Sequence, residues 1–575
     1  MSISANFPNV FPSLELNFAQ SQQLDPRVTF SRSTTAPYYD GKTSALAEQN
    51  LLLQSQNFAT TWSNSGVASI STTATTAPDG TSTGNSITED TSTGVHRFNQ
   101  TVTTLASTSY VFSIYLKYSN CQYVSLINSP VNNSATFDLV NGTVTTSSGT
   151  LSNFITNVGN GWYRVGYVVN NLNAGSTQFF VQMMDSTGTT NNYTGTSRLI
   201  YTWGAQLEQR SSATAYNATT TSAITNYIPQ LLTAPINQPR FDFNPTTGES
   251  LGLLIEQSST NLLTYSQDFS NAVWTKPNST ITATANIAPD GTQTASQFFD
   301  NTTNSLHTLD TGNFAANTYT FSLYAKAGTS NYIGLYSAST STGVFFNLLT
   351  GTFSSNIIGA PTSYTINPVG NGWYRCSVTM TTTTLNIFRI IFSTDGTTYS
   401  YVGTGKYVFI WGAQLEALAF PTSYIPTTSA QVTRAADVAP LLTSGWYNIA
   451  QGTWYSEFIP MITTGTSRAI LATNNYSMYL NASGAIGIYD GTNFPLNGTA
   501  TNNALNKATT LYAQNTLISC LNGINPTTTS AYNNIFASAT TLTISGNNLF
   551  NGRMKKISYY PQALTSTQLQ SLTGS

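Results

Sequence analysis

The stretch Gly159-Asn160-Gly161-Trp162-Tyr163-Arg164 occurs twice in this chain, and its second copy is Gly370-Asn371-Gly372-Trp373-Tyr374-Arg375. The two copies lie 211 residues apart, and other matched motifs keep a separation of 208 or 211 residues. Short insertions in loops explain the small drift. The period is far longer than that of a solenoid or propeller, so the sequence predicts one duplicated domain. The other matched motifs are Asn50–Leu52 with Asn261–Leu263, Ala77–Thr81 with Ala288–Thr292, and Trp203–Glu208 with Trp411–Glu416.

The composition indicates folded strands and argues against disorder. Charged residues make up only 7% of the 575 residues, against a usual value of about 25%. Aromatic residues make up 12%, whereas disordered chains contain few of them. The net charge is −2 and no basic block occurs, so we do not expect a nucleic-acid partner. No run of about 18 apolar residues occurs, so the sequence does not predict insertion into a membrane.

Short runs of strand-forming residues alternate with turn signals throughout the chain. In copy one, Tyr110–Lys117 is rich in aromatic and β-branched residues, and Asp79-Gly80 and Asn141-Gly142 mark turns. Copy two repeats this pattern, for example at Tyr319–Lys326 and Tyr407–Leu415. Many short strands at such spacing predict an all-β fold of tandem antiparallel β-sandwiches, or jelly rolls.

The duplication divides the chain into five segments. The C-terminal segment lacks the repeated motifs and ends in a predicted strand and a capped helical turn, so it is a distinct sandwich. In the leader, Leu14–Phe18 alternates like a short strand. The leader either attaches the protein to something or supplies a strand to the first domain; we favour the strand, because edge strands must be covered. The predicted segments are a leader at 1–48, copy one at 49–228, a linker at 229–255, copy two at 256–437 and the C-terminal domain at 438–575.

Six of the eight tryptophans occupy matched positions in the two copies, which predicts that they are core anchors. They are Trp62, Trp162 and Trp203 in copy one and Trp274, Trp373 and Trp411 in copy two. The three cysteines, Cys121, Cys376 and Cys520, form no CxxC pair, and we expect buried free thiols.

The sequence offers little catalytic chemistry. The only histidines, His96 and His307, lie 211 residues apart, which excludes an HExxH metal helix. The duplicated carboxylates are Asp79 with Asp290 and Glu208 with Glu416. The aspartates are explained by a turn, and the glutamates could bind backbone donors or a cation. Since no convincing acid–base pair emerges, we expect a protein that is not an enzyme.

Several motifs resemble modules that are common in virion proteins of tailed phages. The resemblance covers nearly the whole chain after the leader. These modules are similar to carbohydrate-binding jelly rolls, and the end of the chain, 552–569, resembles a concanavalin A/laminin-G-like, lectin-like sandwich. Copy one departs from the pattern at Ser222–Tyr227, which puts in doubt any site there that requires Arg434 or Asp437. The motifs that carry the resemblance are Pro239–Trp274, Pro289–Thr292, Tyr319–Gly328, Gly370–Arg375, Trp411–Glu416 and Pro421–Asp437.

The resemblance implies a protein of the virion surface, either a tail fibre, a spike or a capsid decoration protein. Such a protein assembles with other virion proteins in the host cytoplasm without a signal peptide and contacts host-surface glycans. A homotrimer is the expectation for fibres, although no heptad pattern is present to enforce it. We expect no cofactor: sandwiches of this kind often hold calcium, but only the resemblance suggests it, since the sequence shows no compact acidic loop of the calcium-binding type. The alternatives are a purely structural decoration protein and a polysaccharide-degrading tailspike, which usually needs short-period repeats that are not visible.

Candidate ligand-binding residues lie in predicted loops of the C-terminal domain, where rings and amides could grip a sugar. Their alternative role is to form hairpin turns. His96 and His307 are further candidates as polar contacts, and their alternative role is packing near a strand start. The loop candidates are Asn474, Asn475, Tyr476, Tyr489, Asp490 and Asn493.

Overall fold

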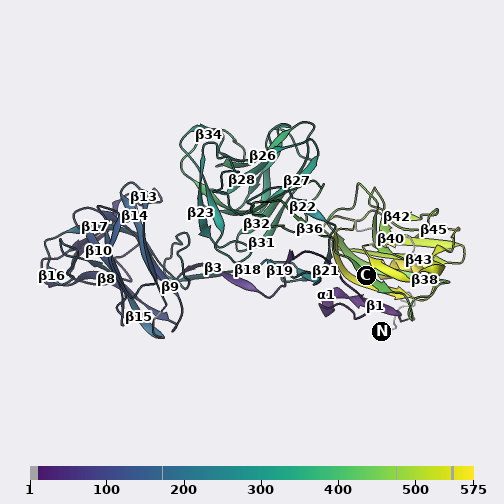
Figure 1. Ribbon diagram of the computed structural model, residues 1–575, viewed down its shortest axis with the longest axis horizontal. Helices are drawn as coiled ribbons and strands as arrows, with labels where there is room; N and C mark the ends of the chain where they lie inside the picture. Colours follow the sequence, from purple (N-terminus) through teal and green to yellow (C-terminus); the bar gives the residue numbers. More distant parts are fainter. Residues whose placement is uncertain (1–10, 171, 474–475, 546–549, 575) are drawn as a thin grey trace. The chain divides into compact units, whose positions relative to one another are not determined.

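The computed structural model describes residues 11–170, 172–473, 476–545 and 550–574, and it is an all-β protein built from antiparallel sheets (Figure 1). The chain forms two compact units. One contains 46–227 with 285–287, and the other contains the remaining described residues. None of the helices in the described ranges has the length and hydrophobicity that crossing a bilayer requires.

Copy one is a sandwich of two six-stranded sheets that enclose one apolar core. The predicted strand Tyr110–Lys117 is observed as β9, which lies between β14 and β17 in the first sheet. The predicted Asn141-Gly142 turn joins β11 to β12. The first sheet has the order β13 (Ser152–Gly159), β14 (Trp162–Val169), β9 (Tyr110–Tyr118), β17 (Leu199–Glu208), β6 (Gly84–Glu89) and β5 (Val67–Thr75). The second has the order β12 (Thr143–Ser148), β11 (Ser134–Asp138), β10 (Tyr123–Ser129), β15 (Gly175–Met183), β8 (His96–Thr104) and β4 (Ser63–Ser65).

Copy two has the same strand order, as the duplication predicts, except that no strand matches β4 among the described residues. Its first sheet runs β31 (Ser363–Gly370), β32 (Trp373–Thr381), β27 (Thr318–Ala327), β35 (Tyr407–Glu416), β24 (Ala295–Asp300) and β23 (Ser279–Asn286). Its second runs β30 (Thr352–Asn356), β29 (Thr342–Asn347), β28 (Tyr332–Ser337), β33 (Asn386–Ser393) and β26 (Thr308–Phe314).

The C-terminal sandwich also has two sheets around one core. One sheet runs β20 (Arg240–Phe243), β21 (Ser250–Ile255), β47 (Gly552–Tyr560), β38 (Gly452–Pro460), β43 (Asn506–Ala513), β44 (Thr516–Leu521) and β45 (Thr527–Thr529). The other runs β37 (Ala439–Leu442), β46 (Thr541–Ile544), β39 (Arg468–Ala472), β40 (Tyr476–Leu480), β41 (Ile486–Tyr489) and β42 (Leu496–Asn497). The first of these two sheets thus includes β20 and β21, which precede copy two in the sequence.

The leader does contain a strand, but its partner is not in the first domain. β1 (Leu14–Asn17) pairs with β47 of the C-terminal sandwich, with Leu14 opposite Tyr559 and Asn17 opposite Lys556. Figure 1 shows this early, purple strand beside the late, yellow sheet. The expectation that the strand at Leu14–Phe18 belongs to copy one is therefore wrong. Leu14 and Leu16 are instead buried in the C-terminal core, which is the physical reason for the pairing.

The segment expected to be a linker, 229–255, supplies strands of its own. β21 pairs with β47, with Leu253 opposite Met554, and extends the edge that β1 also covers. Earlier in the segment, β19 (Leu232–Ala234) pairs with β2 (Ala36–Tyr38) of the leader. β18 (Ile224–Pro229) pairs with β3 (Ser44–Asn50), so the chain enters and leaves copy one through two paired strands.

Smaller elements complete the structure. In α2 the predicted N-cap is confirmed: the Thr565 hydroxyl accepts from Gln568 N–H, and the Gln568 side chain accepts from Thr565 N–H. The small elements are α1 (Phe18–Ser21), α2 (Ser566–Gly574), the 3₁₀ turn η1 (Ile535–Ser538), and the pairs β7 (Thr93–Gly94) with β16 (Tyr193–Thr194), β25 (Asn304–Ser305) with β34 (Tyr401–Val402), and β22 (Ser259–Asn261) with β36 (Val432–Arg434).

All six matched tryptophans are buried, which confirms them as core anchors. Trp162 and Trp373 stand at equivalent places, opposite Lys117 and Lys326 in the neighbouring strand. The indole N–H of Trp162 donates to the Thr76 carbonyl at 3.0 Å, whereas that of Trp373 has no partner within the described structure. The three cysteines are free and buried, as expected.

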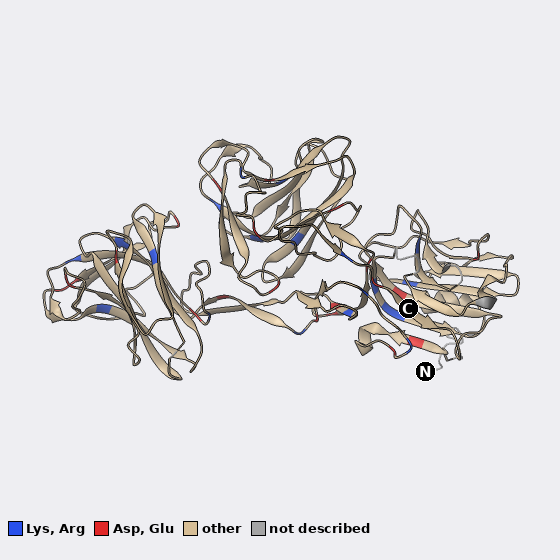
Figure 2. Cartoon of the chain, viewed as in Figure 1, with Lys and Arg blue, Asp and Glu red and all other residues tan. Residues whose placement is uncertain are grey.

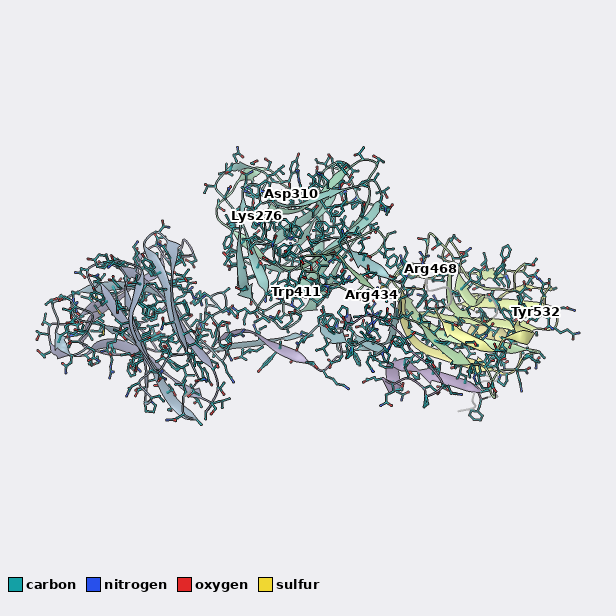
Figure 3. The ribbon with its side chains drawn as sticks, viewed as in Figure 1. Lys276, Asp310, Trp411, Arg434, Arg468 and Tyr532 are labelled. Atoms are coloured by element: carbon teal, nitrogen blue, oxygen red, sulfur yellow. The ribbon has the colours of Figure 1, made fainter. Side chains whose placement is uncertain are left out.

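Two of the matched motifs, the aspartate turn and the Trp-Gly-Ala-Gln-Leu-Glu strand, form one repeated contact set. In copy two, the Trp411 indole (Figure 3) donates to the Thr294 hydroxyl at 3.0 Å, and its ring packs on Tyr424. Thr294 in turn bonds to Thr292, which donates to Asp290 in the predicted turn. Copy one repeats each of these contacts through Trp203, Thr83, Thr81, Asp79 and Tyr216. The motifs are therefore shared because both sandwiches need them to hold this turn.

Candidate functional site

The loop between β41 and β42, here called the 490 loop (residues 489–494), contains three of the predicted ligand residues. Asp490 is buried and shapes the loop. Its Oδ1 accepts from the backbone N–H groups of Thr492 at 3.0 Å and Asn493 at 2.7 Å. Its Oδ2 accepts from the Asn493 amide at 3.0 Å and from the Asn533 N–H at 2.8 Å. The carboxylate thus closes the turn and ties it to the segment before η1.

The charge of Asp490 is stabilised in this position. Burial opposes ionisation, but the hydrogen bonds from Asn493, Asn533 and Thr492 outweigh it and hold the pKa of Asp490 below its ordinary value. With four donors on its two oxygens, the carboxylate is engaged within the protein. This geometry favours the turn-forming interpretation for Asp490 and Asn493 over direct contact with a ligand.

Beside this turn the 490 loop exposes aromatic surface. Phe494 is 57% exposed, and its ring centroid lies 6.4 Å from that of the partly exposed Tyr489. The Tyr489 hydroxyl donates to the Gly491 carbonyl at 2.7 Å, which fixes the ring against the turn. Sequence reasoning missed Phe494. The signal was an aromatic residue four positions after Asp490, in a loop where no core position requires one.

The other three loop candidates are Asn474, Asn475 and Tyr476. Asn474 and Asn475 lie outside the described residues. The backbone of Tyr476 begins β40 and pairs with Tyr489 across the sheet, which places position 476 beside the start of the 490 loop.

The two histidines are buried, which favours the packing interpretation for both. In His96, Nδ1 faces the Gly66 carbonyl at 2.8 Å and Nε2 faces the Tyr193 carbonyl at 3.2 Å. In His307, the corresponding carbonyls belong to Asn278 at 2.6 Å and Tyr401 at 3.2 Å. Each ring therefore ties together two backbone segments at the same place in its sandwich.

The duplicated glutamates also serve the fold. Glu208 is buried and accepts from the Thr214 backbone N–H at 3.0 Å and from the Thr214 hydroxyl. Glu416 accepts in the same way from Thr422. Backbone donors, one of the two predicted partners, are thus present for both. In the described part of the chain, no group of three or more His, Cys, Asp and Glu side chains could hold a metal ion.

Charges are sparse along the chain (Figure 2), yet five of them meet in a buried cluster, here called the junction cluster. The Asp437 carboxylate forms ion pairs with the guanidinium groups of Arg32, at 2.9 Å, and Arg240, at 2.5 Å. Arg240 also contacts Glu256 at 2.8 Å, and Arg434 (Figure 3) lies 3.5 Å from the same carboxylate. Arg434 and Asp437 are the residues that copy one lacks, and here they join the end of copy two to the leader and to the segment before copy two.

The charge of Glu256 is stabilised in the junction cluster. Complete burial disfavours the charge of Glu256, but the attraction of Arg434 and Arg240 prevails and holds its pKa well below the ordinary range. The second Arg32 nitrogen donates to the Pro235 carbonyl at 2.9 Å, which extends the cluster to the segment beside β19. The cluster acts as a structural lock, because removing either carboxylate leaves buried guanidinium groups without their counter-charge.

No protein-family model matches the chain, and no curated protein matches it. Among solved structures, the chain is similar to Trypanosoma rangeli sialidase, with 10% identity, a TM-score of 0.19, and coverage of 96% of this chain and 98% of that one. A mutant of Trypanosoma rangeli sialidase displaying trans-sialidase activity matches with 9% identity, a TM-score of 0.19, and coverage of 95% and 98%. A likeness at this TM-score carries no argument about the fold or activity of this chain.

Proposed function

We propose that this protein is a non-enzymatic component of a phage virion surface that contacts host-surface glycans through its C-terminal sandwich. The virion assignment rests on the motif resemblance in the sequence. The observation that supports glycan contact is the exposed Phe494 ring beside Tyr489, on a turn that Asp490 holds rigid. An aromatic ring on a fixed loop can stack on the apolar face of a sugar without losing much conformational freedom.

The engaged carboxylates support a binding protein over a hydrolase. Asp79 and Asp290 are occupied by their turns, and Glu208 and Glu416 by their threonines. A glycosidase instead needs two carboxyl groups that flank one sugar bond. The proposed partners are other virion proteins and host-surface glycans.

The test is binding of the full chain to a glycan array and to host cells, compared with Phe494→Ala. We expect the substitution to weaken binding about tenfold or more without changing the melting temperature, because the ring is exposed. Ile524→Ala, at another exposed apolar residue of the same sandwich, is the matched control and should bind like the wild type.

Equal binding by Phe494→Ala and the wild type would refute the 490 loop as the contact. No binding by the wild type would favour the purely structural alternative, and shortened glycans after incubation would favour the tailspike. Point substitutions are preferable to a truncation before Pro440, because that truncation would remove β47, the partner of β1 and β21.

A further inference from the structure

Copy two carries a stacked pair of exposed aromatic rings, here called the 353/364 pair. Phe353 on β30 and Tyr364 on β31 have ring centroids 4.8 Å apart and planes inclined by only 20°. Phe353 is 38% exposed and Tyr364 is 43% exposed. β30 and β31 are the edge strands of the two opposed sheets, so the pair lies along one open side of the sandwich.

The fold itself does not require these rings, because copy one does without them. Strand register places Val144 where copy two has Phe353, and Asn153 where copy two has Tyr364. Val144 packs against the core of copy one, whereas Phe353 is directed to solvent over much of its surface. The exposed pair of rings is thus specific to copy two, and we look for its role at the surface of that copy and not in the fold that both copies share.

The connection between β30 and β31 is held against the start of β29. The segment that joins them is anchored by the buried side chain of Ile357. The Ile357 N–H donates to the Gly343 carbonyl at 2.8 Å, and the Gly359 N–H donates to the Ser341 carbonyl at 2.9 Å. The rings therefore form a prepared platform, and a ligand does not have to order them.

The segment that carries the pair is polar and uncharged, and one engaged carboxylate lies in a neighbouring turn. No Asp, Glu, Lys, Arg or His occurs between Lys326 and Arg375. The turn that contacts β30 through a Ser355-to-Gly396 hydrogen bond of 2.7 Å does contain Asp395. That carboxylate is occupied by the N–H groups of two neighbouring threonines, at 2.8 and 2.7 Å. Hydroxyl and amide groups without net charge suit a neutral ligand better than an acidic one.

We propose that the 353/364 pair is a second carbohydrate-binding site that takes neutral sugar rings. The apolar C–H face of a pyranose would stack on the exposed ring surface, and nearby hydroxyl and amide groups would bond to its edge hydroxyls. The site is separate from the 490 loop and does not require that loop to bind. Copy two is then a reader of glycans as well as part of the scaffold.

The test is affinity electrophoresis of the full chain in gels that contain a soluble glucan, galactan or mannan, or an acidic uronan. The informative variant is Phe353→Val combined with Tyr364→Asn, because these are the residues that the same fold carries in copy one. We expect the wild type to be retarded by at least one neutral polysaccharide, and this variant to bind it about tenfold more weakly. Tyr364→Phe keeps the stack and should bind within about twofold of the wild type.

The controls separate this site from the 490 loop. Tyr399→Ala, at another exposed tyrosine of copy two (39% exposed), should leave retardation unchanged. Phe494→Ala should also leave retardation unchanged. If Phe494→Ala binds host cells as well as the wild type does, the 490 loop is refuted as a contact, but the 353/364 pair is not. The inference is overturned if no neutral polysaccharide retards the wild type, if only the uronan does, or if the double variant binds like the wild type while keeping its melting temperature. A double variant that unfolds would also overturn it, since the rings would then be structural.

Discussion

Replacing Asp437 by alanine is the sharpest probe of how the chain is held together. The Asp437 carboxylate is fully buried and contacts Arg32 at 2.9 Å and Arg240 at 2.5 Å, and it accepts the Glu256 N–H at 2.9 Å. Arg240 retains Glu256 after the substitution, but Arg32 retains only carbonyl partners and stays buried. Breaking a buried ion pair on one side costs about 3–5 kcal/mol, and we expect a loss in this range.

The assay is urea unfolding followed by fluorescence and by limited proteolysis of the two compact units. The unit that contains 46–227 has no residue in the junction cluster, so its transition is the internal reference. Asp25→Ala is the control, because Asp25 pairs with the exposed Arg27 and should cost no more than about 1 kcal/mol. A loss below about 1 kcal/mol for Asp437→Ala, or an equal loss in both units, would refute the role of the junction cluster.

Two further predictions concern the cores and pH. Trp162→Ala and Trp373→Ala should each lower the free energy of unfolding by about 3–5 kcal/mol. Phenylalanine should be tolerated better at 373 than at 162, by about 1 kcal/mol, because only Trp162 has a hydrogen bond to lose; equal costs in urea titrations would contradict this. The pKa of Glu256 is depressed on folding, so its stabilisation is complete above its unfolded value of about 4.5 and declines as the pH falls below it. Glu256→Gln should be less stable than the wild type at pH 7, and the difference should shrink in acid; a difference that stays constant down to pH 3 would contradict the assignment.

Local patterns predicted the strands and the tryptophan cores well, because both depend on residues close in sequence. Tyr110–Lys117 forms a strand because it is rich in aromatic and β-branched residues. Trp162 belongs to a motif that both copies share, and it is buried. The partner of β1 could not be predicted in this way. The alternation of Leu14 and Leu16 indicates a strand but does not say which of many edges it joins.

The junction cluster and the exposed rings were missed for related reasons. Arg32, Arg240 and Asp437 are isolated charges on three distant segments, and only the fold shows that they meet. Asp490 was expected among the sugar contacts, whereas its carboxylate is occupied by turn donors and the neighbouring Phe494 is exposed. Sequence pattern locates such a loop, but the direction of each side chain depends on the turn geometry.

The pairing of β1 with β47 has a consequence for the order in which the protein is made. Leu14 leaves the ribosome 545 residues before its partner Tyr559. At about 5–20 residues per second, this strand waits on the order of 30–100 s for its partner. Copies one and two can close their sheets as soon as each is synthesised. The C-terminal sandwich can be sealed only after β47 has been synthesised, so a chain that stalls before β47 would expose β1 and the open edge of β21 to association with other chains.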